Sequence, residues 1–137
     1  MGINDNKVLV SSINYVLNVL SAEFKYHGIV VSGMPAGDYD NIGKYVNEFY
    51  QAGVAYIDKK GDGYNVKFSI ELNNNGDGHL FATVRNMSTD RSIKKFSVKL
   101  FGKNPKMTYD FIHIMMINLM DFVNRNRNKQ IQYERQK

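Results

Sequence analysis

The chain has 137 residues, a formal net charge of +5 and no cysteine; 43% of its residues are hydrophobic and 23% are charged. This length and hydrophobic share are typical of one folded domain and argue against global disorder. Without cysteine the chain has no disulfide, thiolate metal site or cysteine nucleophile. The stretch from Met1 to Leu20 lacks the regions of a signal peptide, so we expect a cytoplasmic protein.

An amphipathic helix is predicted close to the N-terminus. Its apolar residues recur at spacings of three and four, at Leu9, Ile13, Val16, Leu17, Leu20 and Phe24. Asn4, Asp5 and Asn6 offer side-chain oxygens that can cap its first turn. We expect the helix to end at His27, because Gly28 can adopt the left-handed conformation that is common after a helix.

A second helix is predicted after a short strand at Ile29–Val31 and a glycine-rich loop. Its apolar residues fall on one stripe at helical spacing, at Ile42, Tyr45, Val46, Phe49 and Tyr50. Asp38 or Asp40 can cap this helix, and Gly53 can end it.

The segment from Tyr64 to Lys103 predicts the central sheet. In its first run, apolar residues alternate with polar ones, at Tyr64, Val66, Phe68, Ile70 and Leu72. Two further strands are expected at His79–Asn86 and Ile93–Phe101, and Val54–Ile57 can begin the sheet. The strand His79–Asn86 is predicted to bury either Leu80, Ala82 and Val84 or the opposite set, and the strand Ile93–Phe101 is predicted to bury Phe96, Val98 and Leu100. Ile93 is out of phase with this set, which predicts a β-bulge near Lys94.

Two predicted turns share the tripeptide Gly-Asp-Gly, at residues 61–63 and 76–78. The second turn loosely matches the first positions of an EF-hand loop through Asn73, Asn75 and Asp77, but Val84 stands where a bidentate Glu is needed. Hairpin turns, in which glycine supplies a positive φ, therefore explain these residues better than a calcium site.

The last predicted helix, Thr108–Asn124, is apolar on almost every side. Such a helix has to be buried on more than one side. We expect it either in the core, between the sheet and the first helix, or between the subunits of a homo-oligomer. It is too short and too charged to span a bilayer, so no membrane partner is expected.

The predicted fold class is α+β, with two N-terminal helices, a four- to five-stranded antiparallel sheet and a buried C-terminal helix. Residues 1–124 are expected to form a single domain, and residues 125–137 a basic tail. The tail is either a frayed extension of the helix or disordered. Arg125, Arg127 and Lys129 would attract an anionic partner through charge alone.

Positive charge is concentrated in the sheet and the tail, since Tyr64–Lys106 carries eight basic and only three acidic residues. On the sheet face opposite the apolar set, we predict a single-stranded nucleic-acid site formed by Lys67, Phe81, Arg85, Lys95, Lys99 and Phe101. Cations at such a site neutralise phosphates, and aromatic rings stack on bases. In the alternative interpretation, the two N-terminal helices cover Phe81 and Phe101 and leave only a solvated basic rim.

The expected order of elements from Val54 to Asn124, four antiparallel strands and then a long helix, resembles the coactivator and Whirly type of single-stranded DNA-binding protein. The resemblance is one of topology. It implies a homo-oligomer that forms through Thr108–Asn124.

No catalytic motif is present. His27, His79 and His113 lack metal-ligand spacing, and the chain has no nucleophile elbow and no phosphate-binding glycine loop. We therefore expect a protein that is not an enzyme and uses no cofactor or metal. The alternative function is that of a phage-type accessory protein, suggested by the Asn-, Lys- and Tyr-rich composition. Such a protein acts by protein–protein contact, as an inhibitor of a host factor or as an oligomeric structural subunit.

Overall fold

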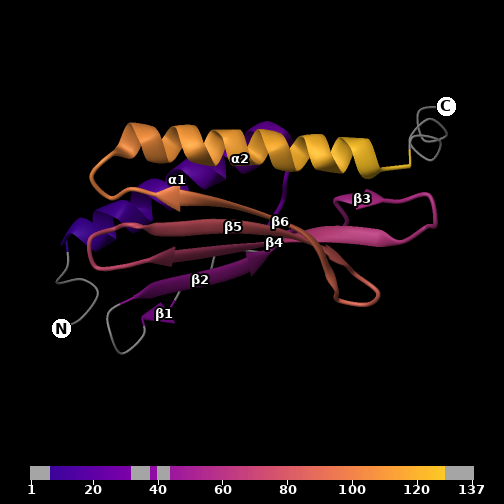
Figure 1. Ribbon diagram of the computed structural model, residues 1–137, viewed down its shortest axis with the longest axis horizontal. Helices are drawn as coiled ribbons and strands as arrows, with labels where there is room; N and C mark the ends of the chain where they lie inside the picture. Colours follow the sequence, from indigo (N-terminus) through magenta and orange to yellow (C-terminus); the bar gives the residue numbers. More distant parts are fainter. Residues whose placement is uncertain (1–6, 32–37, 40–43, 129–137) are drawn as a thin grey trace.

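The computed structural model describes residues 7–31, 38–39 and 44–128 and has an α+β fold (Figure 1). In chain order its elements are α1 (Lys7–His27), β1 (Asp38–Tyr39), β2 (Tyr45–Tyr50), β3 (Tyr56–Ile57), β4 (Gly63–Leu72), β5 (Gly78–Asn86), β6 (Ser92–Leu100) and α2 (Pro105–Asn126). In this part of the chain, neither helix is both long enough and apolar enough to cross a membrane.

The strands form one antiparallel sheet in the order β1-β2-β4-β5-β6, and the short β3 pairs with the start of β4. One row across the sheet places Phe49 of β2 opposite Phe68, Phe68 opposite Ala82, and Ala82 opposite Phe96 of β6. Because residues that lie opposite each other point to the same side, the alternation predicted for β4 continues across the whole sheet.

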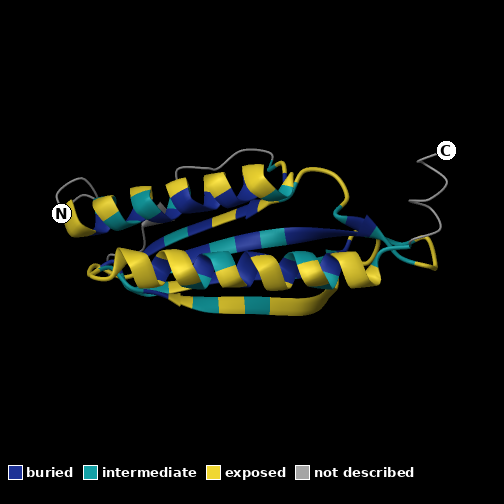
Figure 2. Cartoon of the chain, turned by 90° about the horizontal axis from the view of Figure 1, so that it is seen from above, coloured by how far each residue is buried: buried dark blue, intermediate teal, exposed yellow. Residues whose placement is uncertain are grey.

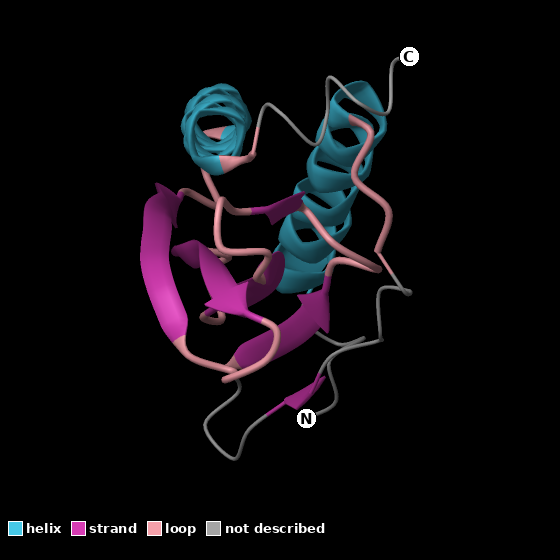
Figure 3. Ribbon diagram, turned by 90° about the vertical axis from the view of Figure 1, so that its right-hand side faces the viewer, coloured by secondary structure: helices cyan, strands magenta, loops and turns pink. Residues whose placement is uncertain are grey.

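Both helices lie on the same face of the sheet, and the core fills the space between them and the strands (Figures 1 and 3). The ring of Phe24 in α1 lies 4.7 Å from that of Phe68 and 6.1 Å from that of Phe49, centroid to centroid. The buried stripe of α2 consists of Thr108, Ile112, Met115, Met116, Leu119 and Val123. No described helix covers the opposite face of the sheet.

The predicted second helix is wrong, because Tyr45–Tyr50 is strand β2 and pairs along β4. Residues four apart, such as Tyr45 and Phe49, lie on the same side of a strand as well as of a helix, so their spacing does not distinguish the two. The pairing with β4 decides between them. As a strand, this segment satisfies the backbone groups along one side of β4 beneath α1, and a helix cannot do so.

Other N-terminal predictions have mixed outcomes. Helix α1 ends at His27, and Gly28 has a φ of +72°, as predicted. The predicted strand Ile29–Val31 is reduced to a single bridge between Val31 and Gln51. Asp38 belongs to β1, whereas the other proposed cap residues, residues 4–6 and 40, lie outside the described part of the chain.

The β-bulge and the hairpin turns are confirmed. Arg85 pairs with Ser92 and Val84 pairs with Lys94, so Ile93 is the extra residue of the bulge. In the β4–β5 turn, the Asn73 side-chain oxygen accepts hydrogen bonds from the backbone N–H groups of residues 75 and 77. This oxygen therefore organises the turn in the way expected of a hairpin.

Helix α2 differs from its prediction in position and burial. It begins at Pro105 with Asn104 as its N-cap, whereas Thr108 exchanges hydrogen bonds with the backbone of Phe101. Only the stripe that faces the sheet is buried. Ile114 and Ile117 on the outer side are 50% and 47% exposed, so this helix is not enclosed within the core of the chain.

Two stacked tyrosines close the end of the sheet at β3. The rings of Tyr56 and Tyr64 lie 4.7 Å apart, and the Tyr64 hydroxyl donates a 2.8 Å hydrogen bond to Asp58. Burial, reinforced by the nearby Tyr64 and Asp58, raises the pKa of Tyr56 to about 12.

We predict that the free energy of unfolding falls between about pH 10 and pH 12 because of Tyr56. In this range an unfolded chain can ionise the phenol at its ordinary pKa, whereas the folded chain still holds it protonated. Chemical denaturation at several pH values should show this fall, and Tyr56→Phe should reduce it. Tyr109→Phe, at an exposed position, is the matched control and should leave the fall unchanged.

A pair of Phe→Ala substitutions tests which face of the sheet is buried. Phe68 is completely buried, so Phe68→Ala should lower the free energy of unfolding by about 3–5 kcal/mol. Phe81 is half-buried on the uncovered face, so Phe81→Ala should cost about 1 kcal/mol or less. Urea denaturation measures both, and equal costs would contradict the assignment of the two faces.

Candidate nucleic-acid interface

The face of the sheet opposite α1 and α2, called the open face below, is defined by strand alternation. In β4 and β5, every second side chain points towards the helices, and the side chains between them point to the open face. Residues of β2 and β6 that pair with these residues point to the same face as their partners. The open face consists of Val46, Glu48, Tyr50, Asn65, Lys67, Ser69, Glu71, His79, Phe81, Thr83, Arg85, Lys95, Ser97 and Lys99.

Five of the six predicted sheet residues lie together on the open face, namely Lys67, Phe81, Arg85, Lys95 and Lys99. Phe101 does not join them. Strand β6 ends at Leu100, and the ring of Phe101 packs 5.8 Å from that of Phe111 in α2. The prediction extended the alternation one residue past the end of the strand, where the chain already turns towards α2.

Phe81 lies at the centre of the open face, with Ser69 and Ser97 opposite it on the two neighbouring strands. These neighbours are small, and the side chains closest to its ring come from Lys95 and His79. The Lys95 ammonium lies 4.3 Å from the ring centroid, and the His79 imidazole stacks nearly parallel to the ring at 5.8 Å. The Lys95 ammonium and the Phe81 ring therefore form a cation–π contact at the centre of the open face.

Tyr50 is an aromatic residue of the open face that the sequence analysis assigned to a helix. Tyr50 is 39% exposed, and the Arg85 guanidinium carbon lies 4.5 Å from the centroid of its ring. The signal that could have identified it is the alternation of the buried Tyr45, Asn47 and Phe49 with less buried residues between them. The buried Asn47 obscures this pattern; its amide donates a 2.8 Å hydrogen bond to the Tyr45 hydroxyl.

Charge is unevenly balanced across the open face. Lys67 pairs with Glu48 at 3.4 Å, and Arg85 pairs with Asp90 and also donates to Asn65. No ion pair with a carboxylate is found for Lys95 or Lys99 within the described residues. Net positive charge therefore accumulates on the β6 side of the open face.

The basic residues at the end of α2 are separate from the open face, since α2 lies on the other side of the sheet (Figure 3). Arg125 belongs to the helix and pairs with Asp121 at 3.1 Å. The backbone N–H of Asn128 donates to the carbonyl of Ile57, which ties this end of the chain to β3. Lys129 lies outside the described residues, so its predicted role stays a prediction.

A polar cluster joins the two helices on the other face. The buried Glu23 carboxylate in α1 lies 2.7 Å from Nδ1 of His113 in α2 and 3.4 Å from Nε2 of His27. The His113 side chain is 41% exposed, so it is not a core histidine. In the described part of the chain, no three His, Asp or Glu side chains are arranged to hold a metal ion.

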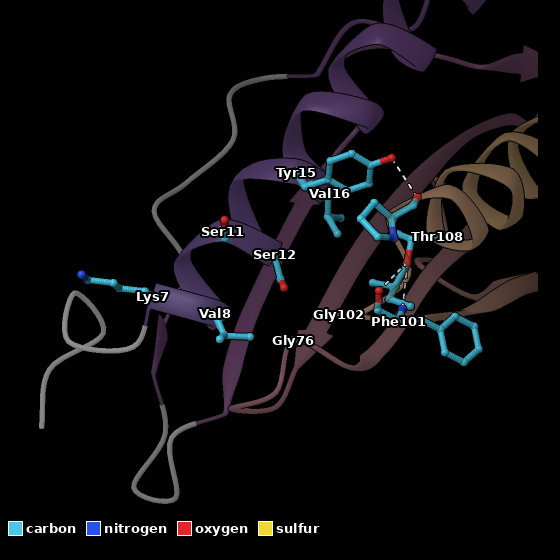
Figure 4. Close-up of a pocket in the computed structure, with 12 residues that line it drawn as sticks. Lys7, Val8, Ser11, Ser12, Tyr15, Val16, Gly76, Phe101, Gly102 and Thr108 are labelled. Atoms are coloured by element: carbon cyan, nitrogen blue, oxygen red, sulfur yellow. Dashed lines mark hydrogen bonds between the residues drawn. The ribbon is translucent and has the colours of Figure 1, made fainter.

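A pocket of about 420 Å³ lies between α1, the β4–β5 turn and the start of α2 (Figure 4). Two of its polar groups bond within the chain: the Tyr15 hydroxyl donates to the carbonyl of Pro105, and the Thr108 hydroxyl donates to that of Phe101. Much of the remaining lining is apolar. The pocket therefore offers space, but not an arrangement of groups typical of catalysis.

Comparison of the chain with protein-family models, with curated proteins and with solved structures finds no match. Function must therefore be inferred from the chemistry of the site.

The contact between Lys95 and Phe81 predicts a specific NMR signature. Because the Lys95 ammonium lies over the ring, the protons beside it should be shifted upfield by the ring current. Phe81→Leu should abolish this shift. The side chain of Lys99 serves as the control in the same spectra, and similar chemical shifts for the two lysines would contradict the contact.

Proposed function

We propose that this protein binds single-stranded nucleic acid on the open face. The observation that carries the proposal is that both helices pack on the opposite side of the sheet. Phe81 and Tyr50 thus lie among Lys67, Arg85 and Lys95 on a face that no described helix covers. The alternative in which helices cover the aromatic residues requires at least one helix on this face, and the described chain has none there.

The chemistry of the open face suits the two parts of a nucleotide. Lys95 and Lys99 are exposed on β6 and have no carboxylate partner among the described residues, so they can neutralise phosphates at little cost. Phe81 and Tyr50 lie further inside the sheet, with Lys95 and Arg85 over their rings. An unpaired base that displaces these cations can stack on the rings, and the displaced cations then lie beside its phosphates. In a duplex, the base faces are stacked on one another, so a flat aromatic surface favours a single strand.

A second candidate function, protein–protein contact, is favoured by the outer side of α2. Met107, Ile114 and Ile117 are 39–50% exposed and follow one another at helical spacing on that side. Exposed apolar groups of this kind are typical of protein contacts. A homo-oligomer that forms through Thr108–Asn124, or an accessory protein that binds a host factor, would bury them. This function does not exclude nucleic-acid binding, because it uses the opposite side of the molecule.

Fluorescence anisotropy with a labelled single-stranded oligonucleotide tests the proposal. Phe81→Leu removes the ring but keeps an apolar side chain, and should weaken binding roughly 5- to 150-fold, equivalent to one lost base stack. Phe101→Leu is the matched control: its ring packs on α2, so binding should not change. Equal effects of the two substitutions, or no binding by the unaltered chain, would refute the open-face site.

The salt dependence of oligonucleotide affinity distinguishes binding by the sheet from binding by the basic tail. Replacing Lys95 and Lys99 with Gln should reduce the slope of log K against log salt by about 1.4, because each phosphate contact on a single strand contributes about 0.7. The control replaces Lys59 and Lys103, two exposed loop lysines, with Gln. A shortened chain that ends at Asn128 should retain specific binding. If binding is lost only in the shortened chain, attraction by the tail would explain it.

A further inference from the structure

Strand β6 forms one edge of the sheet, and its outer side pairs with no described strand. Figure 2 shows it as a largely exposed strand at the margin of the molecule, next to α2. The regular part runs from Lys94, after the bulge, to Leu100, a length of roughly 23 Å. Along this edge, every second residue directs its backbone N–H and C=O groups outward, away from β5. Such an edge is a template for one more strand.

The two sides of β6 differ in chemistry. Towards the helices, Phe96 and Val98 are half-buried, and the ring of Phe96 lies 6.0 Å from that of Phe122 in α2, edge to face. Towards the open face, Lys95 and Lys99 are exposed. A strand added at this edge would direct its own alternate side chains to the same two sides. It therefore needs apolar residues on the helix side and acidic residues on the open-face side.

We propose that the outer edge of β6 binds an extended, acidic segment of a partner protein by β-strand addition. The segment alternates acidic residues with apolar ones. Its backbone completes the hydrogen-bond ladder of the edge, its carboxylates pair with Lys95 and Lys99, and its apolar side chains cover Phe96 and Val98.

The same charges disfavour a second copy of the chain at this edge. Two β6 strands paired about Phe96 would place Lys95 diagonally next to both Lys95 and Lys99 of the other copy on the same face. Like charges at such positions repel, and lysines on an edge strand are a common protection against self-pairing. An acidic segment would instead be attracted by these lysines. The lysines therefore favour an acidic partner over a second copy of the chain at this edge.

The proposal goes beyond nucleic-acid binding, although the two sites share Lys95 and Lys99. The aromatic platform of the open face distinguishes them. Phe81 lies one strand further in, on β5, where an added strand beyond β6 does not reach. Phe81→Leu should therefore weaken the binding of an oligonucleotide much more than the binding of an acidic strand.

The first test uses the full chain and a labelled seven-residue peptide in which Glu and Val alternate. Two further peptides carry N-methyl groups, one on every Glu nitrogen and the other on every Val nitrogen. Only alternate residues of an added strand face the edge, so methylation of one set should abolish binding and methylation of the other should preserve it. Equal binding of both methylated peptides would show attraction by charge alone and would overturn the proposal, as would no binding of the parent peptide.

The second test locates the bound peptide. Replacing Lys95 and Lys99 with Glu should weaken peptide binding about tenfold or more, because two attractive contacts become repulsive. Lys59→Glu with Lys103→Glu makes the same change of charge elsewhere and should have little effect. NMR amide shifts should concentrate in Lys94–Leu100. Shifts centred on β4 and β5, or loss of peptide binding in Phe81→Leu, would place the peptide on the open face and refute the edge site.

Discussion

The rest of the structure depends on the alternation of apolar and polar side chains along β4. Every second residue from Tyr64 to Leu72 is buried, and the strand is paired along both sides. Because all these apolar groups point to one face, both amphipathic helices have to pack there to cover them. The opposite face then has no helix over it in the described part of the chain. The fold and the exposure of the candidate site therefore have the same origin.

The pairing of the strands determines where charged side chains lie on the sheet, as well as where apolar side chains lie. Acidic residues on β2 and β4, together with Asp90 after β5, balance the cations near them. Strand β6 contributes three lysines and no acidic residue, and it lies at the edge, where only one neighbour can offer a carboxylate. The β6 side thus combines unbalanced charge with an edge that pairs with no described strand, and both features favour an extended anionic partner.

Much of the sheet and five of the six predicted sheet residues could be derived from the sequence, because strand alternation is a local property with a period of two. Even the bulge at Ile93 was visible as a break in phase. The segment at Tyr45–Tyr50 was assigned wrongly because spacings of four fit a strand and a helix equally. A buried Asn47, bonded to Tyr45, further concealed the alternation. Phe101 was misplaced because nothing local marks Leu100 as the last residue of the strand.

By itself the sequence determined the period of β4, β5 and β6, the turns between them and therefore which side chains share a face, since these features depend on neighbours within a few residues. Only the tertiary structure decided that β2 joins the sheet and that both helices pack on the same face. It also decided that Lys67 and Arg85 pair with carboxylates, whereas Lys95 and Lys99 pair with none among the described residues. These outcomes depend on contacts between residues distant in the chain. Such contacts are set by the packing of whole elements, which no local pattern records.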